Sequence, residues 1–285
     1  MAIVMKGIEV VNSMKEKLLG ETARLKEAGI NPSLAIVRLG ARLDDLSYEK
    51  GAVKRCEGLG ISCKVVELPD DTSQENLIKV IKRLNDDSDT NGILLFRPLP
   101  KQIEEKVIKY VISPEKDVDC LSPVNVAKVF EGDESGYAPC TPEAVIELLD
   151  HYKINVKGKK VTVVGRSMVV GKPLSMLLLK RHATVTICHT RTTDLEGTCR
   201  SAEILIAAAG KAKMLDSRYI SPGQIVIDVG INVDAAGNLC GDVDFESVSG
   251  IAGYITPVPG GIGTVTTSVL AKHIIQAAAR SAAAS

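Results

Sequence analysis

An abrupt change from a strand pattern to a helix pattern constrains this chain more than any other feature. β-Branched residues run over 161–164 and lead to Gly165, a short turn as far as Gly171, and a leucine-rich stretch from Leu174. Glycines let the chain reverse and allow backbone or ligand to approach closely. Pro173 suits the first turn of a helix, where free amides attract anions. The segment predicts a strand, turn and helix suited to phosphate binding; a purely structural turn is the alternative.

A second predicted strand, 183–188, supplies information about the nucleotide. It ends at His189-Thr190-Arg191, about 25 residues after Gly165, where dinucleotide folds place the side chain that reads the ribose. NAD-specific sites usually carry Asp or Glu there, whereas this chain offers a hydroxyl and a guanidinium, with Arg166 as a second cation. This favours a 2′-phosphate and therefore NADP. The alternative is that both arginines are solvated surface residues.

Composition excludes several classes of partner. The 285 residues, 45% hydrophobic and 25% charged, are ample for two globular domains. Thirty-five basic and thirty-five acidic residues cancel, so we expect a small-molecule ligand, no nucleic acid and no membrane. With no apolar stretch of spanning length and no signal peptide, a cytoplasmic location is expected. Seven cysteines without Cys-x-x-Cys pairing predict reduced thiols, no disulfide and no metal.

Strands alternate with helices along the chain, which predicts an α/β fold with parallel sheets in two domains. The first series has strands near 34–39, 63–68 and 92–96, with a helix begun by a capping box at Thr72–Glu75. The second is Rossmann-like. We place the domains at 1–145 and 146–264, with a C-terminal helix, 265–285, packing back on the first. The second series has strands at 161–164, 183–188, 204–208 and 225–229. Its entry helix starts at Thr141-Pro142-Glu143, with Thr141 as the expected cap.

Three loops have the composition of a binding site: 116–119, 139–142 and 256–264. In the last, prolines stiffen the entry and glycines expose backbone amides just before a helix, so that a ligand could lie against bare main chain. A rigid connector between domains is the alternative. For Asp119 the alternative is a carboxylate that serves a turn or a helix cap.

These segments together resemble, over nearly the whole chain, the bifunctional methylenetetrahydrofolate dehydrogenase/methenyltetrahydrofolate cyclohydrolase family (FolD-type). The resemblance implies an N-terminal catalytic domain, a C-terminal Rossmann domain that binds NADP, a folate cleft between them, tetrahydrofolate one-carbon derivatives as substrates, and a homodimer. It rests on Ser47-Tyr48, Pro98-Leu99-Pro100, Pro114 to Asp119, Pro139-Cys140-Thr141-Pro142, Gly165-Arg166-Ser167 to Pro173, Cys188-His189, Asp228 to Asn232, Gly241 to Asp244 and Pro257-Val258-Pro259-Gly260-Gly261.

The same resemblance assigns residues to roles. Tyr48 would line the folate pocket and Asp119 would hydrogen-bond the pterin, which makes these two the catalytic candidates. The loop from Pro257 to Gly263, with Gly260 and Gly261, would border the folate. The remaining candidates would contact the cofactor: Gly165, Arg166, Ser167, Gly171, Thr190, Arg191 and Ile231.

Three positions depart from the family pattern, and two of them concern the cyclohydrolase. The family Lys four residues after the Tyr is here Ala52, the Gln that supports it is Phe96, and the Gly after the second Asp is Cys120. Position 52 shares a helix face with Tyr48, whereas Lys50 and Lys54 point about 160° and 120° away. Arg55 returns to the face of Tyr48, but a guanidinium is a poor general base; it either holds the ligand's glutamate or lies exposed.

Hydride transfer from the methylene bridge needs positioning and the cofactor, with no proton transfer to the protein. Ring opening of the methenyl product needs protons to be shuttled, a task for a tuned Lys. The sequence therefore predicts an NADP-dependent methylenetetrahydrofolate dehydrogenase with weak or absent cyclohydrolase activity. Two alternatives stand beside it: a fully bifunctional enzyme, in which Lys50, Lys54, or Tyr48 with a water serves hydrolysis, and a non-catalytic folate or nucleotide binder.

Overall fold

The computed structural model describes residues 1–284. These form two compact α/β units, each made of two separate stretches of the chain. The six-stranded unit comprises residues 1–13 and 141–266; the three-stranded unit comprises residues 14–140 and those from 267 on. Ser285, the last residue of the C-terminal helix expected at 265–285, lies outside the described residues.

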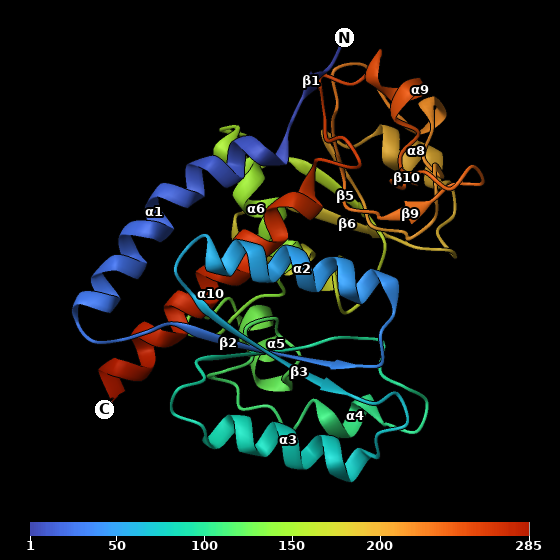
Figure 1. Ribbon diagram of the computed structural model, residues 1–285. Coiled ribbons are helices and arrows are strands. Elements are labelled where there is room, and N and C mark those ends of the chain that lie inside the picture. Colours follow the sequence, from blue (N-terminus) through green and yellow to red (C-terminus); the bar gives the residue numbers. More distant parts are fainter. Residues whose placement is uncertain (285) are drawn as a thin grey trace. The chain divides into compact units, whose positions relative to one another are not determined.

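The three-stranded unit is built on a parallel sheet with the order β3-β2-β4. One face is covered by α3, whose Leu77 and Ile81 pack against Ala35 and Leu95 of the sheet in a buried cluster, while α2 lies on the other side of β2 and β3 (Figure 1). The bounds are α1 (Gly7–Glu27), β2 (Ser33–Leu39), α2 (Leu43–Glu57), β3 (Ser62–Leu68), α3 (Gln74–Asp86), β4 (Gly92–Leu95), α4 (Glu105–Ile108), α5 (Pro123–Glu131) and α10 (Ile262–Ala284).

The six-stranded unit has an all-parallel sheet with the order β1-β11-β8-β7-β5-β6. The chain runs from β5 to β6 on one side and then to β7 on the other, so the strand order reverses beside β5, as in Rossmann folds. The bounds are β1 (Ile3–Val4), α6 (Cys140–His151), β5 (Lys160–Val164), α7 (Gly171–Lys180), β6 (Thr184–Cys188), α8 (Leu195–Arg200), β7 (Ile204–Ala207), β8 (Ile225–Asp228), β9 (Asn232–Val233), β10 (Leu239–Cys240), α9 (Phe245–Ser249) and β11 (Tyr254–Ile255).

The N-terminal segment differs from the expected division of the chain. Ile3 and Val4 pair with Tyr254 and Ile255 of β11, so residues 1–13 group with the six-stranded unit, whereas we expected them in a first domain of residues 1–145. A strand of two residues is too short to show a period-two pattern. Hydrophobic periodicity therefore gave no signal for this exchange.

The expected capping box at the start of α3 is wrong by one residue. The N-cap is Ser73, whose hydroxyl accepts the Asn76 N–H at 3.2 Å, and Thr72 stands before it. Two adjacent hydroxyl residues both satisfy the preference for an N-cap. Glu75, three residues after Thr72, completed a capping-box pattern for Thr72 and therefore indicated the wrong N-cap residue.

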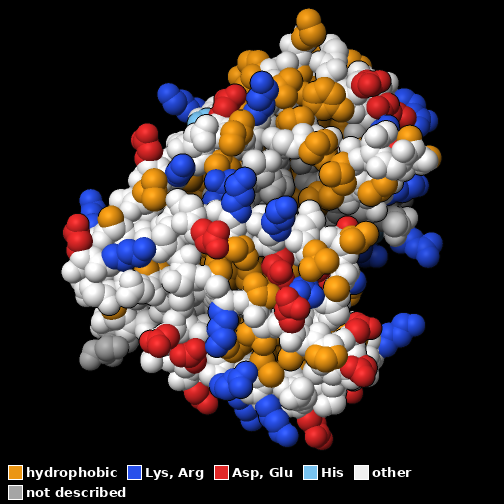
Figure 2. All heavy atoms as spheres, viewed as in Figure 1, with side chains coloured by type: hydrophobic (Ala, Val, Ile, Leu, Met, Phe, Trp, Pro, Cys, Tyr) orange, Lys and Arg blue, Asp and Glu red, His pale blue; other side chains and the backbone are white. Residues whose placement is uncertain are grey.

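Three further observations concern the distribution of charge, the hydrophobicity of the helices and the burial of the cysteines. Acidic and basic side chains are interspersed on the face seen in Figure 2, without a large field of one sign. Within residues 1–284, every helix is too short or too polar to cross a bilayer. Of the seven cysteines, six are buried and Cys63 is partly exposed.

Candidate active site

The turn after β5 requires glycine for reasons internal to the chain. Gly165 has φ 137°, and a Cβ there would collide with the carbonyl of Ala208. A Cβ on Gly171, at the start of α7, would collide with the carbonyl oxygen of Gly165. A glycine at 171 was expected to allow close approach of backbone or of a ligand. In the structure, the Gly165 backbone occupies the space beside Gly171.

Hydrogen bonds within this turn fix its exposed side chains. The Ser167 hydroxyl accepts the N–H of Val170 at 3.1 Å, and the Ser167 carbonyl accepts that of Lys172 at 3.0 Å. Arg166 and Ser167 are exposed on the outside of the turn. The turn therefore presents a guanidinium and a hydroxyl beside the N-terminus of α7, which favours anions.

The turn after β6 leaves the same edge of the sheet. Val164 of β5 is in register with Cys188 of β6, so the segments that follow both strands emerge side by side. The His189 N–H donates to the Thr192 hydroxyl at 2.8 Å, which leaves Thr190 and Arg191 exposed. This sheet edge, which carries Arg166, Ser167, Thr190 and Arg191, is called the cationic edge below.

The next carboxylate along the chain is already engaged. Asp194 accepts the Gly197 N–H at 2.9 Å as the N-cap of α8. It is therefore committed to a helix end and not to the hydroxyls of a ribose. Two guanidinium and two hydroxyl groups without a competing acid fit the 2′-phosphate of NADP, because guanidinium groups bind phosphate oxygens in pairs.

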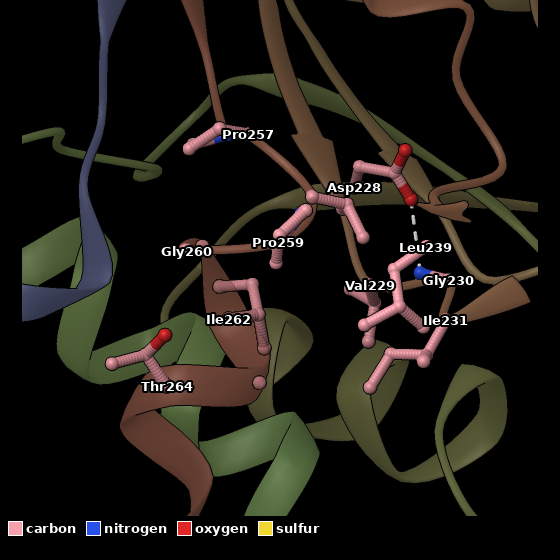
Figure 3. A pocket seen from close by; sticks show the side chains of 13 residues that line it. Asp228, Val229, Gly230, Ile231, Leu239, Pro257, Pro259, Gly260, Ile262 and Thr264 are labelled. Atoms are coloured by element: carbon pink, nitrogen blue, oxygen red, sulfur yellow. Dashed lines mark hydrogen bonds between the residues drawn. The ribbon is translucent and has the colours of Figure 1, made fainter.

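A pocket of about 210 Å³ lies at the carboxyl ends of β8 and β11, beside the start of α10. It brings together three predicted folate contacts, Pro257, Gly260 and Gly261, with the predicted cofactor contact Ile231. In Figure 3, the side chains of Val229, Ile231 and Leu239 gather on one side and that of Thr264 lies on the other. The volume is below that of pockets for whole drug-sized ligands, about 300–1,000 Å³, so it suits one end of a ligand.

Only part of the loop 257–263 is open main chain. Gly260, at φ 100°, is exposed, and a Cβ there would meet nothing closer than Pro257 at 3.8 Å. Gly261 is buried against the carbonyl of Pro257, and its own carbonyl meets Gly7 of α1. Gly260 is thus the position where a ligand could lie against the backbone.

Two buried aspartates hold the loops around this pocket. Asp228 accepts the N–H groups of Gly230, Asp242 and Val243 at 2.8–3.0 Å; its bond to Gly230 is drawn in Figure 3. Asp242 accepts the backbone amides of 209–211 and the side-chain amide of Asn232. Burial raises the pKa of Asp228 to about 6, although its three amide donors act in the opposite direction. Both acids are structural, because their oxygens are occupied by the chain itself.

In the three-stranded unit, Tyr48 and Asp119 form a second group. Part of the Tyr48 side chain is exposed, but its hydroxyl is enclosed, and this burial raises the pKa of Tyr48 well above its ordinary value. Nearby Cys140 and Asp119 raise it further. Tyr48 is therefore a neutral hydrogen-bonding group at any physiological pH, and it is no proton acceptor.

Two of the three positions that depart from the family pattern lie next to Tyr48. Phe96 is 7% exposed, and its ring meets that of Tyr48 edge-on with centroids 5.7 Å apart. Ala52, four residues along α2, is fully buried. Phe96 therefore packs on Tyr48 as part of the protein interior, and position 52 offers a buried methyl group.

The cations of α2 that neighbour Ala52 differ in exposure. Lys50 and Lys54 are exposed, as their helical angles predict, while Ala52 on the face of Tyr48 is buried. Arg55 is half-buried, its Nε is enclosed without a hydrogen-bond partner among the described residues, and burial lowers its pKa. Of the two possibilities for Arg55, ligand contact or full exposure, full exposure is thereby ruled out.

The two acids of the segment 116–119 have different roles. Asp117 is buried and accepts the amides of Leu121 and Ser122 at the entrance to α5; burial raises its pKa. Asp119 is partly exposed, and its Oδ1 accepts the Cys140 N–H at 3.0 Å. The expected capping of α6 by Thr141 is therefore wrong, because α6 starts at Cys140 and a distant carboxylate serves its first amide.

Cys120 and Arg97 complete the surroundings of Asp119. Cys120 has φ 58°, a left-handed conformation natural for glycine, which gives a reason for glycine in the family pattern. Arg97, directly after Phe96, places Nη2 4.0 Å from Asp119 Oδ2 and Nη1 3.4 Å from Glu105. Arg97 was not identified from the sequence. Its position directly before the matched segment Pro98-Leu99-Pro100 could have indicated it.

Fold and site together define an α/β enzyme with a Rossmann-type nucleotide-binding unit. Comparison with known proteins gives the family. Residues 5–119 match the catalytic domain of tetrahydrofolate dehydrogenase/cyclohydrolase, and residues 139–282 match its NAD(P)-binding domain. The chain belongs to this family, which confirms the resemblance, the α/β fold class and the nicotinamide nucleotide as cofactor.

Relatives and solved structures cover almost the whole chain. It is 60% identical over 274 residues to the bifunctional protein FolD of Clostridioides difficile, covering 96% of each chain, and 56% identical to that of Alkaliphilus oremlandii, covering 97% of each. The bifunctional FolD of Campylobacter jejuni superposes with a TM-score of 0.96 at 39% identity, covering 98% of this chain and 99% of that one. The Trypanosoma brucei enzyme, solved with NADP and an inhibitor, gives 0.93 at 36% identity, covering 99% and 98%.

Proposed function

We propose that this protein is an NADP-dependent 5,10-methylenetetrahydrofolate dehydrogenase whose methenyltetrahydrofolate cyclohydrolase activity is weak or absent. The second half of the proposal is supported by the burial of Ala52 and Phe96 beside Tyr48, at the two positions where the family resemblance implies a proton-carrying Lys and the Gln that supports it. The first half rests on the family and on the cationic edge.

The cationic edge binds the cofactor in this proposal. Arg166 and Arg191 hold the 2′-phosphate, while Ser167 and Thr190 add hydroxyl donors. When bound, NADP accepts the hydride that leaves the methylene bridge of the folate. The chain provides position and a bound anion; no side chain needs to gain or lose a proton for this transfer.

Tyr48 and Asp119 orient the folate. Tyr48 stays protonated because burial raises its pKa, so it donates a hydrogen bond to the substrate. Asp119 keeps Oδ2 on the side of Arg97 while Oδ1 is held by α6, and it accepts hydrogen bonds from the amino groups of the pterin. Pro257 and Gly260 contact the folate from their pocket and the buried Gly261 supports their loop, with Ile231 touching the cofactor.

Hydrolysis of the methenyl product is the step that these residues serve poorly. Water must attack the cation, and a proton must then reach the departing nitrogen, which requires a group that titrates near neutral pH. Tyr48 titrates far too high, Arg55 is a poor base, and Ala52 carries no proton. The cyclohydrolase therefore lacks its proton carrier.

Two assays on the purified protein test the proposal: reduction of NADP with methylenetetrahydrofolate, and the decay of methenyltetrahydrofolate with and without protein. We expect NADP reduction, with methenyl decay at its spontaneous rate. Rapid enzyme-dependent decay would overturn the second half of the proposal, and failure to reduce NADP at any folate concentration would overturn the first.

A fully bifunctional enzyme is the second candidate, because relatives at 60% and 56% identity carry the name bifunctional protein FolD. It would need Lys50 or Lys54 to reach the substrate, or Tyr48 to act through a water. The double variant Lys50→Ala/Lys54→Ala separates the lysine route from our proposal, since only that route predicts selective loss of hydrolysis.

A homodimer and a cytoplasmic location are the remaining parts of the proposal. Light scattering of the purified protein tests the homodimer.

A further inference from the structure

Two buried side chains from distant parts of the three-stranded unit meet at one backbone carbonyl. The imidazole Nδ1 of His273, on α10, lies 2.8 Å from the carbonyl oxygen of Val118. The thiol of Cys140, at the start of α6, lies 3.4 Å from the same oxygen and 3.8 Å from that Nδ1. Both side chains are 1% exposed.

The chemistry of the carbonyl fixes the state of the imidazole. A carbonyl oxygen can only accept, so Nδ1 of His273 must carry a proton. With the Cys140 thiol as second donor, both lone pairs of the Val118 oxygen are used. The ring of Tyr137, 5.3 Å from that of His273 between centroids, packs against the imidazole. The carbonyl is thus held from two directions by donors that are themselves fixed.

Asp119 follows this carbonyl directly in the chain. Its Oδ1 accepts the backbone N–H of Cys140 at 3.0 Å, so Cys140 contacts the segment through both its amide and its thiol. On the other side, Cys120 adopts the left-handed conformation. The short run of residues from 118 to 120 lies outside the named strands, so these contacts hold the backbone on both sides of Asp119.

We propose that His273, together with Cys140, is a positioning residue for Asp119: it clamps the Val118 carbonyl and so aims the Asp119 carboxylate at the pterin. The inference rests on the proposed function, because it takes Asp119 as a folate contact. His273 itself touches neither substrate nor cofactor in this proposal. Its effect is therefore confined to folate affinity and turnover, and it leaves binding of the nucleotide alone.

The test compares His273 variants that keep or remove the N–H donor to the Val118 carbonyl. His273→Leu removes Nδ1–H, whereas His273→Asn can place an amide N–H at the same distance from the backbone. Loss of one such hydrogen bond to a buried acceptor corresponds to about tenfold, so we expect His273→Leu to weaken folate binding and to raise the KM for folate about tenfold. The KM for NADP should stay within about twofold, and His273→Asn should restore most of the loss.

Binding of methenyltetrahydrofolate, measured by calorimetry, separates this inference from the proposed function. A wild-type protein that binds the folate but does not reduce NADP overturns the proposed function, and the series of affinities still tests the clamp. Equal affinity in the wild type and in a folded His273→Leu variant overturns the clamp alone. So does equal loss in folded His273→Leu and His273→Asn variants, because the donor would then be irrelevant.

A second pair covers the case in which His273→Leu does not fold. Cys140→Ser keeps a hydroxyl donor for the Val118 carbonyl, and Cys140→Ala removes it, while both keep the backbone amide that Asp119 uses. We expect folate affinity to fall more for Cys140→Ala than for Cys140→Ser, with a KM for NADP equal to that of the wild type. Identical folate affinities in the two variants would overturn the clamp.

Discussion

The cationic edge and the Tyr48–Asp119 group are built in different ways. The cationic edge comes from two short segments that follow neighbouring strands in register, and its side chains are exposed. The Tyr48–Asp119 group draws on α2, the end of β4, the segment before α5, and the start of α6. Its members are largely enclosed, and their environment changes their chemistry, as the raised pKa of Tyr48 shows.

This difference determines how strongly a change at one position affects its neighbours. Exposed groups on a rigid sheet edge act almost independently, because strand register places them. In an enclosed group, each side chain fills space next to another, so that a change at one position affects the packing of its neighbours. Ala52 and Phe96 are both buried, and the Phe96 ring packs on Tyr48.

The largest expected effect comes from placing an amine at position 52. Ala52→Lys with Phe96→Gln returns an amine to the face of Tyr48 and removes the ring that fills the space. General acid–base catalysis contributes about 10²–10⁴-fold, so methenyltetrahydrofolate hydrolysis should rise by a factor in that range, measured as absorbance decay over the spontaneous rate. Ala52→Met with Phe96→Leu is the matched control without an amine. No gain in a folded Lys/Gln variant would show that position 52 does not limit hydrolysis.

The next largest effect concerns the turn that carries the cationic edge. In Gly171→Ala the new methyl group collides with the Gly165 carbonyl, and backbone cannot yield as a flexible side chain does. We expect a loss of about 1–3 kcal/mol in the free energy of unfolding, and a KM for NADP raised more than the KM for folate. Gly20→Ala, inside α1 and with nothing within 4 Å, is the control; it should leave both KM values unchanged and stabilise the protein by up to about 1 kcal/mol, because alanine favours the helix. An unchanged Gly171→Ala variant would mean that the turn is more compliant than its packing indicates.

A smaller effect distinguishes the two arginines from ordinary surface charges. Arg191→Ala and Arg166→Ala each remove a charged donor to the 2′-phosphate, which is worth about 1.5–3 kcal/mol. We expect the preference for NADP over NAD, as a ratio of kcat/KM, to fall at least about tenfold in each. Arg24→Ala, at an exposed position of α1, should leave the ratio unchanged. If Arg191→Ala does the same, the solvated-arginine alternative holds for that residue.

Prediction from sequence succeeded where the determinants are local. The strand, glycine turn and helix from 160 to 180 follow from adjacent residues, and the separation of Lys50 and Lys54 from the face of Tyr48 follows from helical geometry. The register of β5 with β6 then brings the two cationic segments together without further information.

Prediction failed where a residue's partner lies far away in the chain. The cap of α6 comes from Asp119, twenty-one residues before Cys140, and the clamp on Val118 involves His273, 155 residues away. Neither leaves a periodic or local pattern. The N-terminal strand is similar, because its two residues gain a structure only by pairing with β11.

The smallest expected effect tests whether Cys120 is a neutral departure. A left-handed residue other than glycine costs about 1–2 kcal/mol, so Cys120→Gly releases strain, while it also gives up a buried thiol and adds freedom to the unfolded chain. These contributions oppose each other, and we expect the free energy of unfolding to change by less than about 1 kcal/mol. Cys199→Gly is the matched control.

Cys199 is also fully buried, but it lies within α8 without a left-handed backbone. Glycine there costs about 1 kcal/mol in helix propensity, and the cavity adds to it. Denaturant unfolding should therefore separate the two variants clearly. If both lose the same stability, the left-handed conformation at 120 carries no strain, and the glycine of the family pattern must serve the Tyr48–Asp119 group in another way, because a side chain at 120 lies directly beside Asp119.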